Sequence, residues 1–246
     1  MCLSYGITSL QDATIHNNID RMKLFNDFKK EGSLVPSLIF MIGESHLKEF
    51  LNNGYKFMEV VDGVSLGAVK IMLTLTTGVL YPSSVELRKI INYATRNGFQ
   101  VAIHAVDNQA VSEAAKALAT SGNFTGNSLR HRIEHGSECM PDVMSIMASN
   151  DVSVVTQPGF LYYSGERYLS TVDSNNQEWL YPINSLMSLG IQLAYGSDNP
   201  VIPINPLVGI HSAVNRISNA GHELTLNERV SPIEALHMYT LGSAYV

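Results

Sequence analysis

Four polar residues interrupt apolar segments that are otherwise typical of buried β-strands. They are Lys70 in Ala-Val-Lys-Ile-Met-Leu, His104 at the end of Val-Ala-Ile-His, His135 at the end of Arg-Ile-Glu-His, and Asp198 after Leu-Ala-Tyr-Gly-Ser. Taken singly, each has an ordinary explanation: a hydrogen-bonded core histidine, a turn-forming aspartate, or a lysine that extends to solvent. Together, two imidazoles, a carboxylate and a lysine predict a site for a divalent metal such as Zn²⁺.

The lysine limits the chemistry of such a site. A protonated Lys70 would repel a metal ion, so it can contribute only when deprotonated or when converted by CO₂ to an anionic N-carboxylate. A different possibility is that a buried lysine with a depressed pKa acts as a Schiff-base amine. That alternative leaves His104, His135 and Asp198 without a role.

Short apolar segments that could position these residues recur roughly every 30 residues, which is the length of one βα unit. The predicted strands are Gly6–Leu10, Ser37–Ile42, Ala68–Leu73, Gln100–Val106, His131–His135, Val152–Thr156 and Ile191–Tyr195. The predicted helices are Ser84–Asn97, Asn108–Thr120, Pro141–Ser149, Ile183–Leu189 and a final helix Ser231–Ala244. Nearly continuous apolar strands indicate a parallel sheet covered on both faces. The polar residues would then meet at the carboxyl ends of the strands, where barrel active sites lie.

The composition fits one α/β domain over residues 1–246. The chain has 45% hydrophobic and 15% charged residues and a net charge of −6. No basic cluster favours nucleic acid as a partner, and no apolar run reaches the about 20 residues of a membrane span. Cys2 and Cys139 without a Cys-x-x-Cys pattern favour a reducing, cytoplasmic location. A (β/α)8 barrel lacking one unit and an open doubly wound sheet both fit the pattern of elements.

One connection is unusually long and aromatic. It runs from Gly159 to Tyr181 and includes Tyr162, Tyr163 and Trp179. Loops of this length in a compact domain are often lids or binding loops, although an aromatic cluster that packs a surface loop is the plainer alternative. The segment is therefore predicted to be a loop that either meets the substrate or packs as an aromatic surface cluster.

Several motifs occur in the order found in the amidohydrolase superfamily. They are Gly6-Ile7-Thr8-Ser9, Val69-Lys70-Ile71, Ile103-His104-Ala105, Arg132-Ile133-Glu134-His135, Thr156-Gln157-Pro158, Gly196-Ser197-Asp198-Asn199-Pro200-Val201 and Ser231-Pro232-Ile233-Glu234-Ala235-Leu236. The chain resembles amidohydrolase family 3, the branch with members similar to N-substituted formamide deformylase. The resemblance extends over essentially the whole chain and implies a TIM-type (β/α)8 barrel.

The resemblance also implies roles for individual residues. Lys70 would be a carboxylated lysine that bridges two metal ions, and His104 and His135 would bind the more exposed ion. Asp198 would bind the buried ion and act as the general base toward the bridging water. Gln157, Tyr162 and Tyr163 would contact a small amide-type substrate. The implied reaction is hydrolysis of a carbon–nitrogen bond other than a peptide bond.

The chain departs from the family pattern at both ends. The family begins with a strand ending in His-x-His, a pattern that is absent here, and it continues after the barrel into a small β-sandwich. A closed barrel without one strand would lose on the order of 10 kcal/mol of apolar burial, comparable with the about 5–15 kcal/mol stability of a whole domain. We therefore expect a fragment truncated at both ends, or a homo-oligomer in which a partner covers the gap.

The missing ligands also bear on activity. Without the two histidines of the His-x-His strand, we expect an impaired site with at most one well-held ion. The alternative function is a non-catalytic barrel remnant that binds a ligand or a protein partner.

Overall fold

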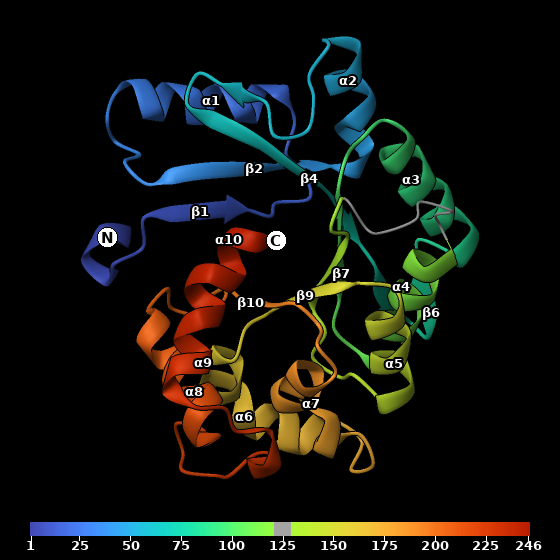
Figure 1. The fold of residues 1–246 in the computed structure, drawn as a ribbon, viewed down its shortest axis with the longest axis vertical. Coiled ribbons are helices and arrows are strands. Elements are labelled where there is room, and N and C mark those ends of the chain that lie inside the picture. Colours follow the sequence, from blue (N-terminus) through green and yellow to red (C-terminus); the bar gives the residue numbers. More distant parts are fainter. Residues whose placement is uncertain (121–128) are drawn as a thin grey trace. The chain divides into compact units, whose positions relative to one another are not determined.

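The computed structural model describes residues 1–120 and 129–246 and divides into two compact units. The first unit contains Met1–Met72 and Pro82–Ile103, and the second contains Leu73–Tyr81 and His104–Val246 (Figure 1). The boundary after Ile103 falls inside the strand that carries His104.

The first unit is built on parallel strands. The parallel pairs are β1 with β2 and β2 with β4, whereas the short β3 is antiparallel to β4. Next to β4 lies the beginning of β7, where the Val69 amide donates to the Gln100 carbonyl (2.8 Å). The strands are β1 (Ser9–Asp12), β2 (Ser37–Gly43), β3 (Val60–Val61), β4 (Val64–Met72) and β7 (Val101–Ala105).

Side-chain caps begin two of the helices of this unit. Asn18 caps α1 (Ile19–Lys30) by accepting from the Arg21 amide, and α1 packs against β4 (Figure 1). Ser83 and Glu86 form a reciprocal capping box that starts α3 (Ser84–Arg96). Buried apolar residues of three strands, Met41, Ala68 and Ala102, pack together in one cluster. Interior layers of this kind are characteristic of barrel strands.

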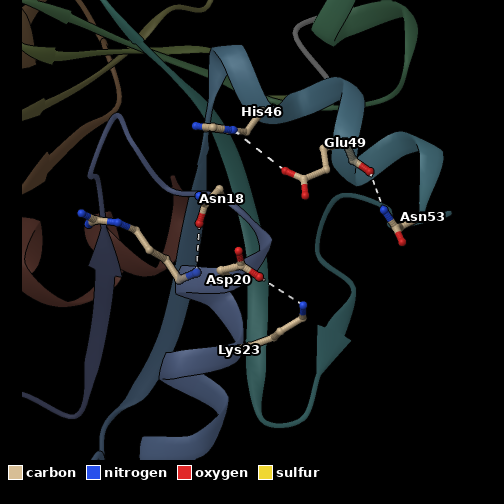
Figure 2. Close-up of polar contacts among 7 residues, drawn as sticks. Asn18, Asp20, Lys23, His46, Glu49 and Asn53 are labelled. Atoms are coloured by element: carbon tan, nitrogen blue, oxygen red, sulfur yellow. Dashed lines mark hydrogen bonds and ion pairs between the residues drawn. The ribbon is translucent and has the colours of Figure 1, made fainter.

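The helix α2 (Leu47–Asn52) shows how His46 is used in the first unit. Its Nδ1 lies 3.9 Å from Oε2 of Glu49, and Asn53 donates to the Glu49 carbonyl at the other end of the helix (Figure 2). Figure 2 also shows the exposed Asp20–Lys23 pair of α1 (3.2 Å). Exposed ion pairs such as Asp20–Lys23 contribute little to stability. The contact of His46 with Glu49 is likewise a local one, at the start of a helix.

The second unit continues the βα alternation. β8 pairs with β9, and β9 with β10, all in parallel. Its strands are the hairpin β5 (Thr74–Thr76) and β6 (Val79–Tyr81), the end of β7, β8 (Arg132–His135), β9 (Ser153–Thr156) and β10 (Leu193–Tyr195). Its helices are α4 (Asn108–Thr120), α5 (Pro141–Ser149), α6 (Gly159–Thr171), α7 (Ile183–Ser188), α8 (Pro206–Asn215), α9 (Pro232–His237) and α10 (Ser243–Tyr245). α8 packs against both α6 and α9 (Figure 1).

Most predicted elements are confirmed, and α4 and α5 have the predicted bounds. The first strand begins later than predicted, because Gly6 with φ 75° ends a 3₁₀ turn at Cys2–Tyr5. The final helix is interrupted by a π-helical turn, η5 (Met238–Gly242), which packs against β10. Gly242 lies so close to this strand that a Cβ atom would come within 2.3 Å of the Leu193 carbonyl oxygen.

The prediction of a loop at Gly159–Tyr181 is wrong for most of that segment. Residues Gly159–Thr171 form the helix α6, which begins directly after the end of β9. Gly165 lets this helix approach its neighbours, since a Cβ there would lie 2.7 Å from the Cβ of Ser218. The aromatic residues pack instead of forming a free lid: the hydroxyls of Tyr168 and Tyr181 are hydrogen-bonded at 2.8 Å in the interior.

Among the described residues, no helix combines the length and apolar character needed to cross a bilayer.

His131, just before β8, makes the stability of the second unit depend on pH. Burial lowers the pKa of its imidazole to about 4. The unfolded chain takes up a proton here below about pH 6.5, whereas the folded chain resists protonation until about pH 4, so stability is lost as the pH falls through this interval.

We predict that the free energy of unfolding, measured in urea, is about 2 kcal/mol lower at about pH 5 than at about pH 7.5, at about 1.4 kcal/mol per pKa unit. His131→Asn should remove most of this difference, and His237→Asn, which changes an exposed histidine of α9, should keep it. An equal pH dependence in the His131 variant would contradict the assignment.

Candidate functional site

Two of the predicted site residues lie together in the second unit. His104 is in β7 and His135 ends β8, and their ring centroids are 4.5 Å apart in a T-shaped arrangement. His135 is 7% exposed, and His104 is partly exposed. The two imidazoles therefore come from the carboxyl ends of successive strands, as predicted.

The backbone turns sharply at His135. Its φ is 75° and that of Gly136 is 57°, so two consecutive residues have the left-handed conformation. This conformation costs a residue with a Cβ roughly 1–2 kcal/mol. The Gly136 amide donates to the Ala105 carbonyl (3.0 Å) and holds the turn against β7. Strain of this kind at a strand end marks a candidate functional position.

Gln157 is the polar partner of His135. Its Oε1 lies 2.6 Å from Nδ1 of His135, and its Nε2 donates to the Val155 carbonyl at 3.1 Å. Gln157 follows β9 directly and is 4% exposed. The predicted substrate contact of Gln157 remains untested, but its amide is already bonded to a candidate metal ligand.

Lys70 belongs to the first unit. It lies in β4, opposite Gly43 of β2, and is 4% exposed. A protonated amine at such a depth requires compensation by partners. Its predicted role as a metal ligand stays a prediction.

Asp198 lies in a tight turn that follows β10. The residue is exposed and has φ 57°, a conformation that Asp and Asn adopt more easily than most residues. The turn is closed by the Val201 amide, which donates to the Asp198 carbonyl (2.9 Å), and by the Asn199 amide, which donates to Ser197 Oγ (3.2 Å). Its roles as metal ligand and general base likewise stay predictions.

The fit to a metal ion is partial. In residues 1–120 and 129–246, no three side chains of the His, Cys, Asp and Glu types lie close enough together to hold an ion. Among the described residues, the structure thus brings together two potential nitrogen ligands, His104 and His135, without a third side chain of these types. Two imidazoles suit Zn²⁺ and related ions, and a catalytic zinc site commonly has three protein ligands.

The two predicted aromatic contacts are on α6. The rings of Tyr162 and Tyr163 are 5.1 Å apart, and that of Tyr162 is 5.9 Å from the ring of His211 on α8. Both tyrosines are partly exposed. They occupy the first turns after the end of β9, and their contact with a substrate stays a prediction.

One acidic residue near this end of β8 was not singled out from the sequence. Glu138 follows His135 by three residues, and burial raises the pKa of its carboxyl group, opposed by a hydrogen bond from Asn176 (3.4 Å). A carboxyl group with a raised pKa beside a strand end is a candidate proton donor. Its position three residues after His135 could have pointed to Glu138 from the sequence.

The opposite face of β8 holds a buried ion pair. Nε of Arg132 donates to Oε1 of Glu134 at 2.8 Å, with side chains 1% and 6% exposed. Side chains alternate between the two faces of a strand, so Arg132 and Glu134 share the face of β8 opposite His135. They are bonded to each other along the strand that presents His135.

Comparison with known proteins identifies the family. Residues 1–246 match the Amidohydrolase family along the whole chain. The chain is 29% identical over 173 residues to the putative amidohydrolase YtcJ of Bacillus subtilis (strain 168), an alignment covering 69% of this chain and 32% of the relative. It is 28% identical over 170 residues to N-substituted formamide deformylase of Arthrobacter pascens, covering 68% and 31%. The chain belongs to the amidohydrolase family, in the predicted family 3 branch.

A solved structure shows the fold. An uncharacterized metal-dependent hydrolase from Pyrococcus horikoshii OT3 superimposes with a TM-score of 0.86 at 24% identity, over 100% of this chain and 53% of that protein. The fold is therefore an incomplete (β/α)8 barrel of the amidohydrolase type. The chain spans about a third of the curated relatives and about half of this solved neighbour.

The Arg132–Glu134 pair provides a test of how β8 is held. We predict that Glu134→Leu lowers the free energy of unfolding by about 3–5 kcal/mol, because the variant leaves the Arg132 guanidinium buried without this carboxylate. Adding Arg132→Met should recover a large part of the loss, because both charges are then gone. Urea unfolding of the two single variants and the double variant measures this. A Glu134→Leu variant as stable as the wild type would show that the pair does not support the strand.

Proposed function

We propose that this chain forms part of a metal-dependent hydrolase site that cleaves the carbon–nitrogen bond of a small amide- or formamide-type substrate. The observation that carries the proposal is the His104–His135 pair, with ring centroids 4.5 Å apart. Family membership supports hydrolysis, and one relative in the alignment is an N-substituted formamide deformylase.

In this proposal His104 and His135 hold one divalent ion, most plausibly Zn²⁺. Lys70, as an N-carboxylate, and Asp198 complete the ligand set. Carboxylation would replace a buried ammonium with an anion, and an anion suits a site that binds a cation. A bound metal ion would supply a water molecule with a lowered pKa, about 7, and a Lewis acid for the scissile carbonyl.

The remaining steps belong to side chains of this chain. Asp198 accepts a proton from the attacking water and delivers it to the leaving nitrogen, a transfer suited to an accessible carboxylate. Tyr162 and Tyr163 orient the substrate from α6. We also propose a reducing, cytoplasmic location, which fits the free thiols of Cys2 and Cys139.

A second candidate function is a ligand- or partner-binding remnant without catalysis. It is favoured by the absence of a third His, Cys, Asp or Glu side chain beside the histidine pair in the described residues. The two candidates differ in whether metal binding is accompanied by turnover.

The proposal predicts distinct effects of three variants of the full chain. His104→Asn and His135→Asn should each lower the Zn²⁺ or Co²⁺ affinity at least about tenfold, because each removes a nitrogen ligand. Asp198→Asn should lower kcat for N-formyl and amide substrates about 10²–10⁴-fold, the usual contribution of a proton-transfer group. Metal titration and single-substrate kinetics measure these effects.

His237→Asn, at an exposed position of α9, is the matched control and should leave both quantities unchanged. Metal affinity that is insensitive to His104 and His135 would refute the proposal. Metal bound through these histidines with no turnover of any amide substrate would favour the non-catalytic alternative.

A further inference from the structure

The amide of Gln157 is held in one orientation by the backbone beside it. Its two polar atoms face two different groups, the Val155 carbonyl oxygen at 3.1 Å and Nδ1 of His135 at 2.6 Å. A carbonyl oxygen can only accept a hydrogen bond, so the NH₂ group must face Val155. The opposite orientation would set two acceptor oxygens against each other.

This orientation determines where His135 carries its proton. The Gln157 oxygen that faces Nδ1 has no hydrogen to donate, so Nδ1 must be the donor of the 2.6 Å bond. In a neutral imidazole with the proton on Nδ1, the lone pair is on Nε2. Nε2 is then the nitrogen of His135 that can bind a metal ion.

The anchor behind Gln157 is rigid. Val155 lies in β9, where it is paired with Glu134 of β8 on one side and Ala194 of β10 on the other. Gln157 itself is 4% exposed, which excludes water as a competing partner over most of its surface. The Val155 carbonyl thus fixes the orientation of the Gln157 amide, and the amide fixes which nitrogen of the His135 ring carries the proton.

We propose that Gln157 is a positioning residue that keeps His135 in the Nδ1–H tautomer and so makes Nε2 its metal-binding nitrogen. The metal-binding part of this inference rests on the proposed function, whereas the tautomer does not. Partners of this kind usually change metal affinity by about 10–100-fold when removed. The proposal replaces the predicted substrate contact of Gln157 with an action through His135.

The test compares three variants of the full chain by two measurements. Gln157→Met has a similar length but neither polar atom, Gln157→Glu keeps an acceptor oxygen, and Gln109→Met changes an exposed glutamine of α4 as the control. The first measurement is the ¹⁵N chemical shifts of the His135 ring in the metal-free chain at a pH where the ring is neutral, assigned by comparison with His135→Asn. The second is Zn²⁺ affinity from competition with a chromophoric chelator.

We expect the wild type and the control to show the Nδ1–H tautomer and equal Zn²⁺ affinity. Gln157→Met should shift the ring toward the Nε2–H tautomer and weaken Zn²⁺ binding by about 10–100-fold. Gln157→Glu should restore the Nδ1–H tautomer, which a purely structural role for Gln157 would not require. If Gln157→Met fails to fold, the wild-type tautomer and the Gln157→Glu variant still decide the question.

Two results would overturn the proposal: an Nε2–H tautomer in the wild type, or a Gln157→Met variant with unchanged tautomer and unchanged Zn²⁺ affinity. A wild-type chain that binds no Zn²⁺ although its tautomer follows Gln157 would refute the proposed function and uphold the control of His135 by Gln157.

Discussion

The short contact between His135 and Gln157 is the interaction on which the candidate site depends. It joins the ends of β8 and β9, and it acts on a ring whose backbone is already held in a left-handed turn with φ 75°. Two constraints thus act on one histidine: the turn sets the position of its Cβ, and the amide sets the direction and protonation of its ring. A flexible imidazole would lose rotamer freedom on binding an ion, whereas this one has lost much of it on folding. The fold itself therefore holds the ring of His135 in place.

The parallel strands explain why the two histidines could be found from the sequence. His104 and His135 each lie at the end of a predicted strand, and consecutive parallel strands have their carboxyl ends at one edge. The helices α4 and α5 could be predicted with their bounds. Asp107 caps the start of α4, Pro141 begins α5, and apolar positions recur at helical spacing. These features are local in the sequence, and local rules were sufficient for them.

The errors arose where contacts distant in sequence decide the structure. The segment that forms α6 contains Gly159, Gly165 and several aromatic residues of modest helix propensity, so its pattern favoured a loop. In the structure this helix packs against α8, and Gly165 lies close to Ser218, far along the chain. The direction of the Gln157 amide depends on contacts seen only in the folded chain, with the Val155 carbonyl and with a histidine 22 residues earlier. The predicted substrate contact of Gln157 stays a prediction.

The charge of the site limits what can complete it. Two neutral imidazoles contribute no negative charge, so an ion held by His104 and His135 would keep its full double charge in a partly buried place. Burying an uncompensated charge is costly, and an anionic ligand is the usual compensation. Glu134 is unsuited to this role because it faces the other side of β8 and is bonded to Arg132. Acidic residues that follow strands of the second unit include Asp107 after β7, Glu138 after β8 and Asp198 after β10. An anion is therefore the kind of ligand that the two histidines would still require to hold a divalent ion.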